Sequence, residues 1–204
     1  NYDLAVLLTS ISYIALIVTT IIFPLYYQGV LHVSPFVSGM ALVPGAVFLS
    51  ILNPLSGKLA DKIGFKPTML GGMVMIICGW LVGLTMLSRL SLVAMILCAM
   101  IIEGGNAFVM MPAVTLGANS LPDKLVPHGT AVITTVRQVL GSAGVAVATI
   151  VLTVASEHAL SAGSKPLAAN LHGYHLVFIM MVVIELVGLV LAVMLKNTKK
   201  QGAK

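Results

Sequence analysis

The sequence predicts an all-α membrane protein with six transmembrane helices. Of its 204 residues, 59% are hydrophobic and only 8% are charged, and the mean hydropathy is +1.08. Soluble domains carry about 25% charged residues, so the composition excludes a water-soluble enzyme, a nucleic-acid-binding protein and a disordered chain. The alternation of polar and apolar residues that is typical of a membrane β-barrel is absent. Helices, which pair their own backbone groups within lipid, are therefore the predicted elements.

Six apolar runs are long enough to cross a bilayer, because about 20 helical residues span a hydrocarbon core about 30 Å thick. The first run is too long for a signal peptide, lacks a basic flank and is followed by no small-residue cleavage site. Gly57 and Gly64 permit a tight turn between the second and third runs, and Pro67 suits the first turn of the third helix. The fourth, fifth and sixth runs each contain one charged residue. The approximate bounds of the predicted helices are 4–27, 37–55, 68–87, 92–116, 129–154 and 174–195.

Basic residues orient the predicted bundle in the membrane. Six spans place both termini on one side, and most Lys and Arg residues fall in segments on that side. Because basic loops remain in the cytoplasm, both termini are predicted to be cytoplasmic, and residues 196–204 form a basic cytoplasmic tail. The net charge of +5 reflects this bias, so it does not indicate a nucleic-acid partner. The residues on the terminal side are Lys58, Lys62, Lys66, Lys124, Lys196, Lys199, Lys200 and Lys204.

The segment between the second and third runs has a distinctive pattern. It reads Gly57-x-Leu59-Ala60-Asp61-Lys62-x-Gly64-x-Lys66. By composition alone it is a solvated charged turn, in which Asp61 pairs locally or faces the N-terminus of a helix. The pattern also resembles the loop signature of the major facilitator superfamily, although Phe65 stands where that signature is basic. The resemblance implies a loop motif made by Gly57, Asp61, Lys62, Gly64 and Lys66.

Two further stretches resemble the fourteen-span drug:proton antiporter branch of that superfamily. They are residues 23–30, FPLYYQGV, and residues 135–146, TVRQVLGSAGVA. Glu103 departs from the branch, which usually has a small residue there. The resemblance covers the C-terminal half of such proteins only, and it implies one six-helix half-bundle made of two inverted three-helix repeats. The resemblance therefore implies that residues 1–204 form one wall of a substrate cavity and that the N-terminal half of such a transporter is not part of this chain. Because the chain starts at Asn1 without an initiator Met, we expect it to be part of a longer protein.

Three charged residues lie within the predicted spans: Glu103, Arg137 and Glu185. Charges are expensive in lipid and therefore mark candidate functional sites. Arg137 and Glu185 lie at similar depths from the cytoplasmic side, about 12–15 Å at about 1.5 Å per residue, so they can pair between neighbouring helices. Glu103 lies near the midplane. The functional interpretation makes Glu103 or Glu185 a proton carrier influenced by Arg137, whereas the structural interpretation has an Arg137–Glu185 pair that locks two helices.

Neutral polar, aromatic and methionine side chains mark candidate positions on the cavity wall. Methionine adapts to many ligand shapes, and aromatic faces attract cations. The alternative is that such residues only let membrane helices pack closely and bond to one another. The candidates are Tyr13, Tyr26, Gln28, Asn106, Met110, Thr134 and Gln138.

These features predict half of a secondary active transporter in a bacterial plasma membrane. The resemblance implies that it exports hydrophobic, cationic small molecules against inward proton flow by alternating access, and that the Asp61 loop latches its cytoplasmic side. The sequence has no phosphate-binding Gly-Lys-Ser/Thr loop, so the proton gradient is the expected energy source, with no bound cofactor or metal. No nucleophile–base arrangement suggests an enzyme. Two alternatives remain open: a metabolite or nutrient transporter, and a six-helix membrane scaffold that transports nothing by itself.

Overall fold

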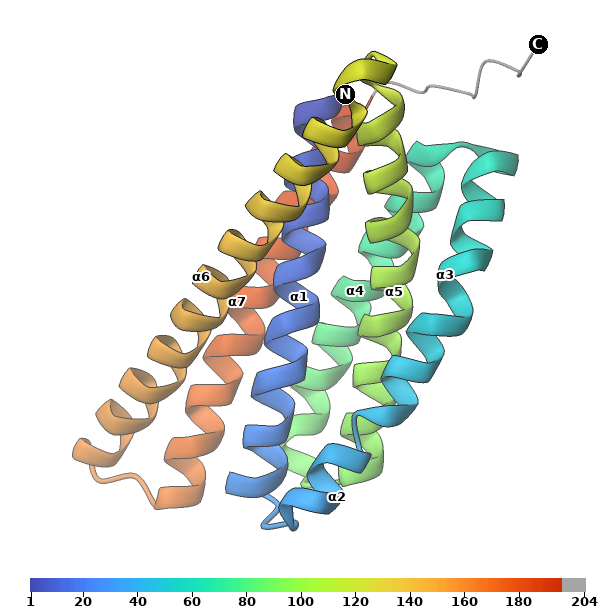
Figure 1. The fold of residues 1–204 in the computed structure, drawn as a ribbon. Helices are drawn as coiled ribbons and strands as arrows, with labels where there is room; N and C mark the ends of the chain where they lie inside the picture. Colours follow the sequence, from blue (N-terminus) through green and yellow to red (C-terminus); the bar gives the residue numbers. More distant parts are fainter. Residues whose placement is uncertain (196–204) are drawn as a thin grey trace.

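The computed structural model describes residues 1–195, which form a bundle of long helices (Figure 1). The predicted tail, residues 196–204, lies outside the described residues. No β-strand occurs within the described part of the chain. The helices are α1 (Tyr2–Gly29), α2 (Pro35–Met40), α3 (Val43–Ile63), α4 (Phe65–Met86), α5 (Leu92–Asn119), α6 (Val126–Ser161) and α7 (Pro166–Met194), with short 3₁₀ turns η1 (Leu87–Arg89) and η2 (Asp123–Leu125).

Six segments of the described residues are long and apolar enough to cross a membrane, which confirms the predicted fold class. Five of them are single helices or a helix with its 3₁₀ turn, while the second span consists of α2 and α3 together. Both ends of the described chain lie at the same end of the bundle (Figure 1). At that end, the hydroxyl of Tyr2 on α1 donates a hydrogen bond to the carbonyl oxygen of Gly129 on α6 over 2.8 Å.

The last two long helices extend beyond their apolar runs. α6 covers Val126–Ser161, and α7 starts at Pro166, whereas the apolar runs predicted 129–154 and 174–195. Polar residues do not end a helix when water can solvate them, so an apolar run marks the lipid-spanning part of a helix rather than its ends. The actual breaks have conformational causes. Gly163 has a φ of 88° just after α6, and Pro166 occupies the first turn of α7.

The predicted turn between the second and third spans is much shorter than expected. α3 continues to Ile63 and α4 begins at Phe65, so Gly64 alone separates them. Gly57 lies inside α3, and the prediction that it helps to form the turn is wrong. Gly64 makes the turn with a φ of 101° and a ψ of 159°, a conformation essentially reserved for glycine. Pro67 lies in the first turn of α4, as the sequence predicts.

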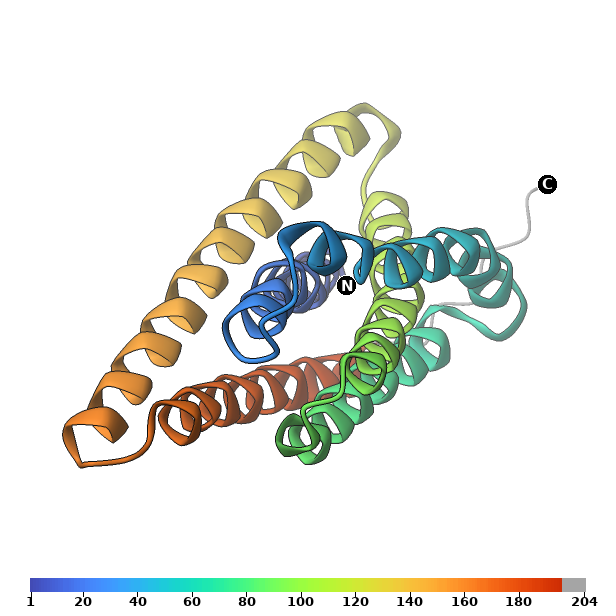
Figure 2. The same ribbon diagram turned by 90° about the horizontal axis from the view of Figure 1, so that it is seen from below.

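α1 and α5 form the centre of the bundle. α1 packs against α5, α6 and α7, while α5 packs against α1, α3 and α4. Seen along the bundle, α3 and α6 lie on opposite flanks, and α4 and α7 close one side (Figure 2). In the apolar windows of α1 and α5, 56% of the residues are buried, whereas the windows that contain α3 and α6 are only 17% buried. The two flanking helices therefore present most of their apolar residues outward.

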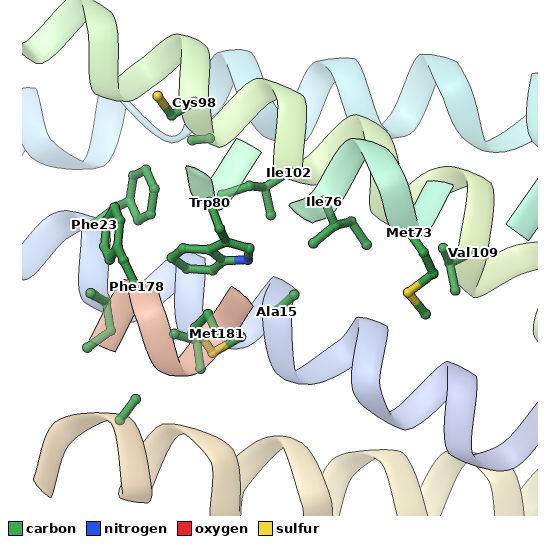
Figure 3. Packing of buried hydrophobic residues seen from close by; sticks show 14 of the residues in the cluster. Ala15, Phe23, Met73, Ile76, Trp80, Cys98, Ile102, Val109, Phe178 and Met181 are labelled. Carbon is green, nitrogen blue, oxygen red and sulfur yellow. The ribbon is translucent and has the colours of Figure 1, made fainter. Parts of the chain in front are cut away.

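Aromatic side chains form the core at the end of the bundle opposite the termini. Phe23 of α1 stacks on Phe178 of α7 with ring centroids 5.6 Å apart, and Trp80 of α4 meets Phe178 edge-on at 5.0 Å (Figure 3). Edge-on and offset-stacked pairs of this kind stabilise a core beyond the area that they bury. These contacts fix α1, α4 and α7 to one another and leave α3 and α6 outside the aromatic cluster.

Candidate functional site

A cavity of about 310 Å³ lies between α1, α3 and α5. Glu103 is the one ionisable side chain among the residues that line it, and the other polar side chains are those of Thr19 and Thr20. The rest of the wall is apolar. A cavity with a mostly apolar wall and a few convergent polar groups is the usual form of a small-molecule site. The lining residues are Leu16, Thr19, Thr20, Leu42, Gly45, Ala46, Leu49, Ala99 and Glu103.

Glu103 projects from α5 towards α3 at this cavity. The side chain is 8% exposed, and its Oε2 is buried with no hydrogen-bond partner among the described residues. A Cβ atom placed on Gly45 would lie 3.2 Å from the Cγ of Glu103, closer than nearly all Cβ contacts in proteins. Gly45 therefore gives the carboxyl side chain room at the α3 wall. The role of Glu103 in proton coupling stays a prediction.

Thr19 and Thr20 are neighbours in sequence but differ in their hydrogen bonding. The hydroxyl of Thr20 donates to the carbonyl oxygen of Leu16 within α1 over 2.8 Å. Thr19 is 1% exposed, and its Oγ1 has no hydrogen-bond partner in the described part of the chain. Two buried oxygen atoms, one from Glu103 and one from Thr19, thus occur unpaired in residues that line the same cavity.

Thr19 is one of the polar residues of the first apolar run that the sequence suggests for the cavity wall, and its spacing along α1 indicates which helix it faces. Ser12 and Thr19 are seven residues apart, which places them on one face of α1. Asn106 and Glu103 are three residues apart on α5 and share a face in the same way. Ser12 donates a hydrogen bond to Asn106, so these two faces meet. The pairing of two such polar stripes predicts that Thr19 lies near Glu103.

Glu185 and Arg137 do not form the predicted pair. Glu185 is fully buried on α7, and neither of its carboxyl oxygens has a hydrogen-bond partner among residues 1–195. Glu185 and Gly188 are three residues apart and share a face of α7. This face packs against α1 and α4, because a Cβ atom on Gly188 would lie 2.9 Å from Ile11 and 3.1 Å from Met73.

Arg137 instead lies against α1. The Cζ atom of its guanidinium is 5.1 Å from the centroid of the Tyr13 ring, which is the geometry of a cation–π contact. Depth along two helices predicted the Arg137–Glu185 pair, but depth does not say which neighbour each side chain faces. Here α1 packs against both α6 and α7, and the ring of its Tyr13 contacts the guanidinium of Arg137.

Three of the predicted cavity residues make hydrogen bonds that hold the bundle together. The hydroxyl of Tyr26 is buried and donates to the carbonyl oxygen of Leu87 over 2.8 Å. The Nε2 of Gln28 donates to Ser38 over 3.1 Å and ties the end of α1 to α2. The Oδ1 of Asn106 accepts the bond from Ser12 between α1 and α5. The remaining candidates are partly or fully accessible: Tyr13, Met110 and Thr134 are half-buried, and Gln138 is exposed.

The predicted loop motif brings together the ends of three helices. Asp61 and Lys62 lie in the last turn of α3, and Gly64 makes the turn into α4. The Nζ of Lys66, in the first turn of α4, donates to the carbonyl oxygen of Val193 near the end of α7 over 2.6 Å. Lysine is favourable there because the last carbonyls of a helix lack internal partners and carry partial negative charge. A latch function for this loop stays a prediction.

Residues 5–204 match the sequence model of a protein family described as the Major Facilitator Superfamily. The chain belongs to the Major Facilitator Superfamily. The superfamily predicted from the loop motif is therefore confirmed, and membership indicates a transmembrane transporter rather than an enzyme.

Several relatives within the Major Facilitator Superfamily match most of this chain. The MFS-type transporter YcnB of Bacillus subtilis is 36% identical over 199 residues, 98% of this chain and 42% of that protein. The lincomycin resistance protein LmrB of Listeria monocytogenes is 31% identical over 207 residues, 97% of this chain and 43% of that protein. The multidrug resistance protein B homolog of Mycobacterium tuberculosis is 26% identical over 140 residues, 68% of this chain and 26% of that protein. The chain is thus a multi-pass membrane protein of a bacterial type, and it spans less than half the length of these relatives.

Proposed function

We propose that the chain is the C-terminal half of a proton-coupled exporter of hydrophobic, cationic compounds. The observation that carries the proposal is the buried, unpaired Oε2 of Glu103 in a residue that lines an apolar cavity. The names of two relatives, which refer to lincomycin resistance and multidrug resistance, support the export of drug-like compounds. The match to less than half of each relative supports a transporter that has a further half outside this chain.

Glu103 provides a simple basis for exchange of a proton and a substrate. A carboxyl group in an apolar cavity is stable when it is protonated or when a cation neutralises it, because an isolated buried charge is strongly unfavourable. Among residues 1–195, no other ionisable side chain lines the cavity. A proton and a cationic substrate therefore exclude one another at Glu103. Binding of a proton releases the substrate, and loss of the proton allows the next substrate to bind.

Alternating access requires a second bundle, and this bundle has a surface suited to one. α3 and α6 lie on opposite flanks of α1 and α5 (Figure 2), and large apolar side chains on both are exposed, among them Val47 and Ile51 on α3 and Val139 and Ile150 on α6. In the proposal, the N-terminal half packs on the side of the bundle opposite α4 and α7, where it contacts both flanking helices, and lipid covers the rest. Rocking of the halves opens the cavity to each side of the membrane in turn.

The loop that contains Asp61 latches the cytoplasmic side in one of these states. The Lys66–Val193 hydrogen bond supports the latch, because it already joins the start of α4 to the end of α7. Replacement of Asp61 with Asn is expected to impair transport by the full-length protein without lowering its expression. A normal transport rate at normal expression contradicts the latch.

The main test uses the full-length transporter in proteoliposomes that carry a proton gradient. Drug-driven proton movement and proton-driven drug efflux are measured for the wild type and for Glu103→Gln. We expect the variant to lose the coupling between the two fluxes, because an amide neither carries a proton nor neutralises a cation. Glu185→Gln serves as the comparison, since Glu185 lies outside the cavity lining. Unchanged coupling in Glu103→Gln contradicts the proposal, and uptake of a neutral metabolite without any response to cations favours a nutrient transporter.

A further inference from the structure

We propose that the cavity between α1, α3 and α5 selects substrates whose charged nitrogen still carries an N–H, that is, protonated amines, over quaternary ammonium ions. The N–H group would donate to the carboxylate of Glu103 or to the hydroxyl oxygen of Thr19. Among the residues that line this cavity, these two side chains contain a buried oxygen with no partner in residues 1–195. This inference rests on the proposed function, because it specifies the substrate class of the same site.

The unpaired atoms of the cavity call for a hydrogen-bond donor. An ionised carboxylate only accepts hydrogen bonds, and a threonine hydroxyl accepts as well as donates. The hydroxyl of Thr20 is already committed to the carbonyl oxygen of Leu16. A buried acceptor without a donor is destabilising, and a hydrogen bond to a charged group is stronger than one between neutral groups. A ligand with an N–H group should therefore bind to this cavity more tightly than a ligand without one.

A quaternary ammonium ion offers this cavity little beyond its charge. It has no N–H, and its alkyl groups hold the positive nitrogen away from the carboxylate. Proteins recognise such ions with the faces of aromatic rings, but no aromatic side chain is among the residues that line the cavity. The aromatic residues that follow Thr20 on α1, namely Phe23, Tyr26 and Tyr27, are fully buried and packed against other rings. The ring of Phe48 on α3 packs against Gly104 of α5.

The rest of the cavity also fits an organic amine better than a metal ion. No three His, Cys, Asp or Glu side chains gather anywhere in residues 1–195 in a way that could hold a metal. The wall around Glu103 includes Leu16, Leu42 and Leu49, which suit the apolar substituents of an amine. A volume of about 310 Å³ lies at the lower end of the range for ligand pockets, about 300–1,000 Å³.

The test compares two probes that differ in the nitrogen alone: dansyl-propyl-dimethylamine, which is protonated at neutral pH, and its trimethylammonium counterpart. Binding of each to the purified full-length transporter is measured by fluorescence, and export is measured separately in proteoliposomes. We expect the wild type to bind the amine at least about tenfold more tightly, the factor expected for a hydrogen bond to a charged group. Glu103→Gln should bring the two affinities close together.

Thr19 provides the sharper test, because its neighbour is a matched control. Thr19→Val should weaken binding of the amine and leave the quaternary ion unchanged, whereas Thr19→Ser should keep the preference because it keeps the hydroxyl. Thr20→Val makes the same substitution on the same cavity wall, but the hydroxyl that it removes is already hydrogen-bonded within α1. It should therefore affect both probes equally and preserve their ratio.

Equal affinity of the wild type for both probes overturns the inference, as does an equal loss of preference in Thr19→Val and Thr20→Val. If both probes are exported without preference, the inference fails while the proposed export function stands. If the amine binds with the expected preference but neither probe is exported, the inference holds and the proposed export function fails.

Discussion

The hydroxyl of Ser12 on α1 donates a hydrogen bond to Oδ1 of Asn106 on α5 over 2.5 Å, and both side chains are fully buried. Asn106 lies one helical turn from Glu103, and its Nδ2 donates back to the carbonyl oxygen of Ile102. This bond joins the two central helices next to the cavity. It therefore sets the separation between the α1 wall and the α5 wall on which Glu103 lies.

The Ser12–Asn106 bond is expected to contribute measurably to stability. In a double-mutant cycle with Ser12→Ala and Asn106→Ala, we expect a coupling energy of about 0.6–1.7 kcal/mol, the range for hydrogen bonds between membrane helices. The measurement is reversible unfolding of the full-length protein in mixed micelles. Thr149→Val is the control, because the exposed hydroxyl of Thr149 bonds only within α6. Additive effects of the two alanine substitutions would show that the bond does not couple the helices.

The aromatic ring of Tyr13 is expected to contribute more to the free energy of unfolding than its hydroxyl group does. Arg137 lies 5.1 Å from the ring centroid, and no hydroxyl bond of Tyr13 is present among the described residues. Tyr13→Leu should lower the free energy of unfolding by about 0.5–2 kcal/mol, the range for cation–π contacts, whereas Tyr13→Phe should stay close to the wild type. Gly141→Ala should resemble Tyr13→Leu, since a Cβ there would lie 2.6 Å from the ring. Equal effects of Phe and Leu at position 13 would exclude the cation–π contact as the cause.

Two glycines of the loop motif are expected to respond in opposite ways to alanine. Gly64→Ala should destabilise the protein by about 1–3 kcal/mol, because its φ of 101° with a ψ of 159° is strained for any other residue. Gly57→Ala should be neutral or stabilise by up to about 1 kcal/mol, since Gly57 is helical and a Cβ there meets nothing within 4 Å. Thermal unfolding of the two variants in detergent measures the difference. A destabilised Gly57→Ala would indicate a contact with another part of the transporter.

The buried carboxyl group of Glu185 is expected to destabilise the folded protein. Both of its carboxyl oxygens are buried and have no partner within the described part of the chain, so Glu185→Met should raise the free energy of unfolding by about 1–3 kcal/mol, the usual penalty for unsatisfied buried polar groups. Glu185→Gln keeps two buried polar atoms and should gain less. Unfolding and proton-coupled transport are measured on the same preparations. If Glu185→Met is less stable than the wild type, the carboxyl group has a partner in the folded transporter.

Several features could be predicted from particular residues. Glu103, Arg137 and Glu185 stand out because each interrupts an apolar run, and a charge within such a run is rare enough to indicate a site. The loop around Asp61 indicated the family, which the match to residues 5–204 confirms. In both cases the information is local, because it depends on residue type and spacing along one segment.

The partners of these residues could not be predicted in the same way. Thr19 and Thr20 are chemically identical neighbours that line the same cavity as Glu103. The hydroxyl of Thr20 bonds to Leu16, whereas that of Thr19 has no partner among the described residues. Consecutive residues point about 100° apart around a helix axis, so the face that meets α5 is decided by how the helices pack. The same reason explains why Arg137 lies on Tyr13 rather than on Glu185.

The apolar runs are enough to predict a helical membrane protein with six spans, because lipid requires long apolar helices and tolerates few charges. The sequence also indicated the family and the three charged positions within the spans. The packed bundle was needed to show that Gly64 alone makes the loop turn and that Arg137 and Glu185 do not pair. It was also needed to show that Thr19, Gly45 and Glu103 line one cavity. These outcomes depend on the rotation and close approach of whole helices, which no single segment of the sequence specifies.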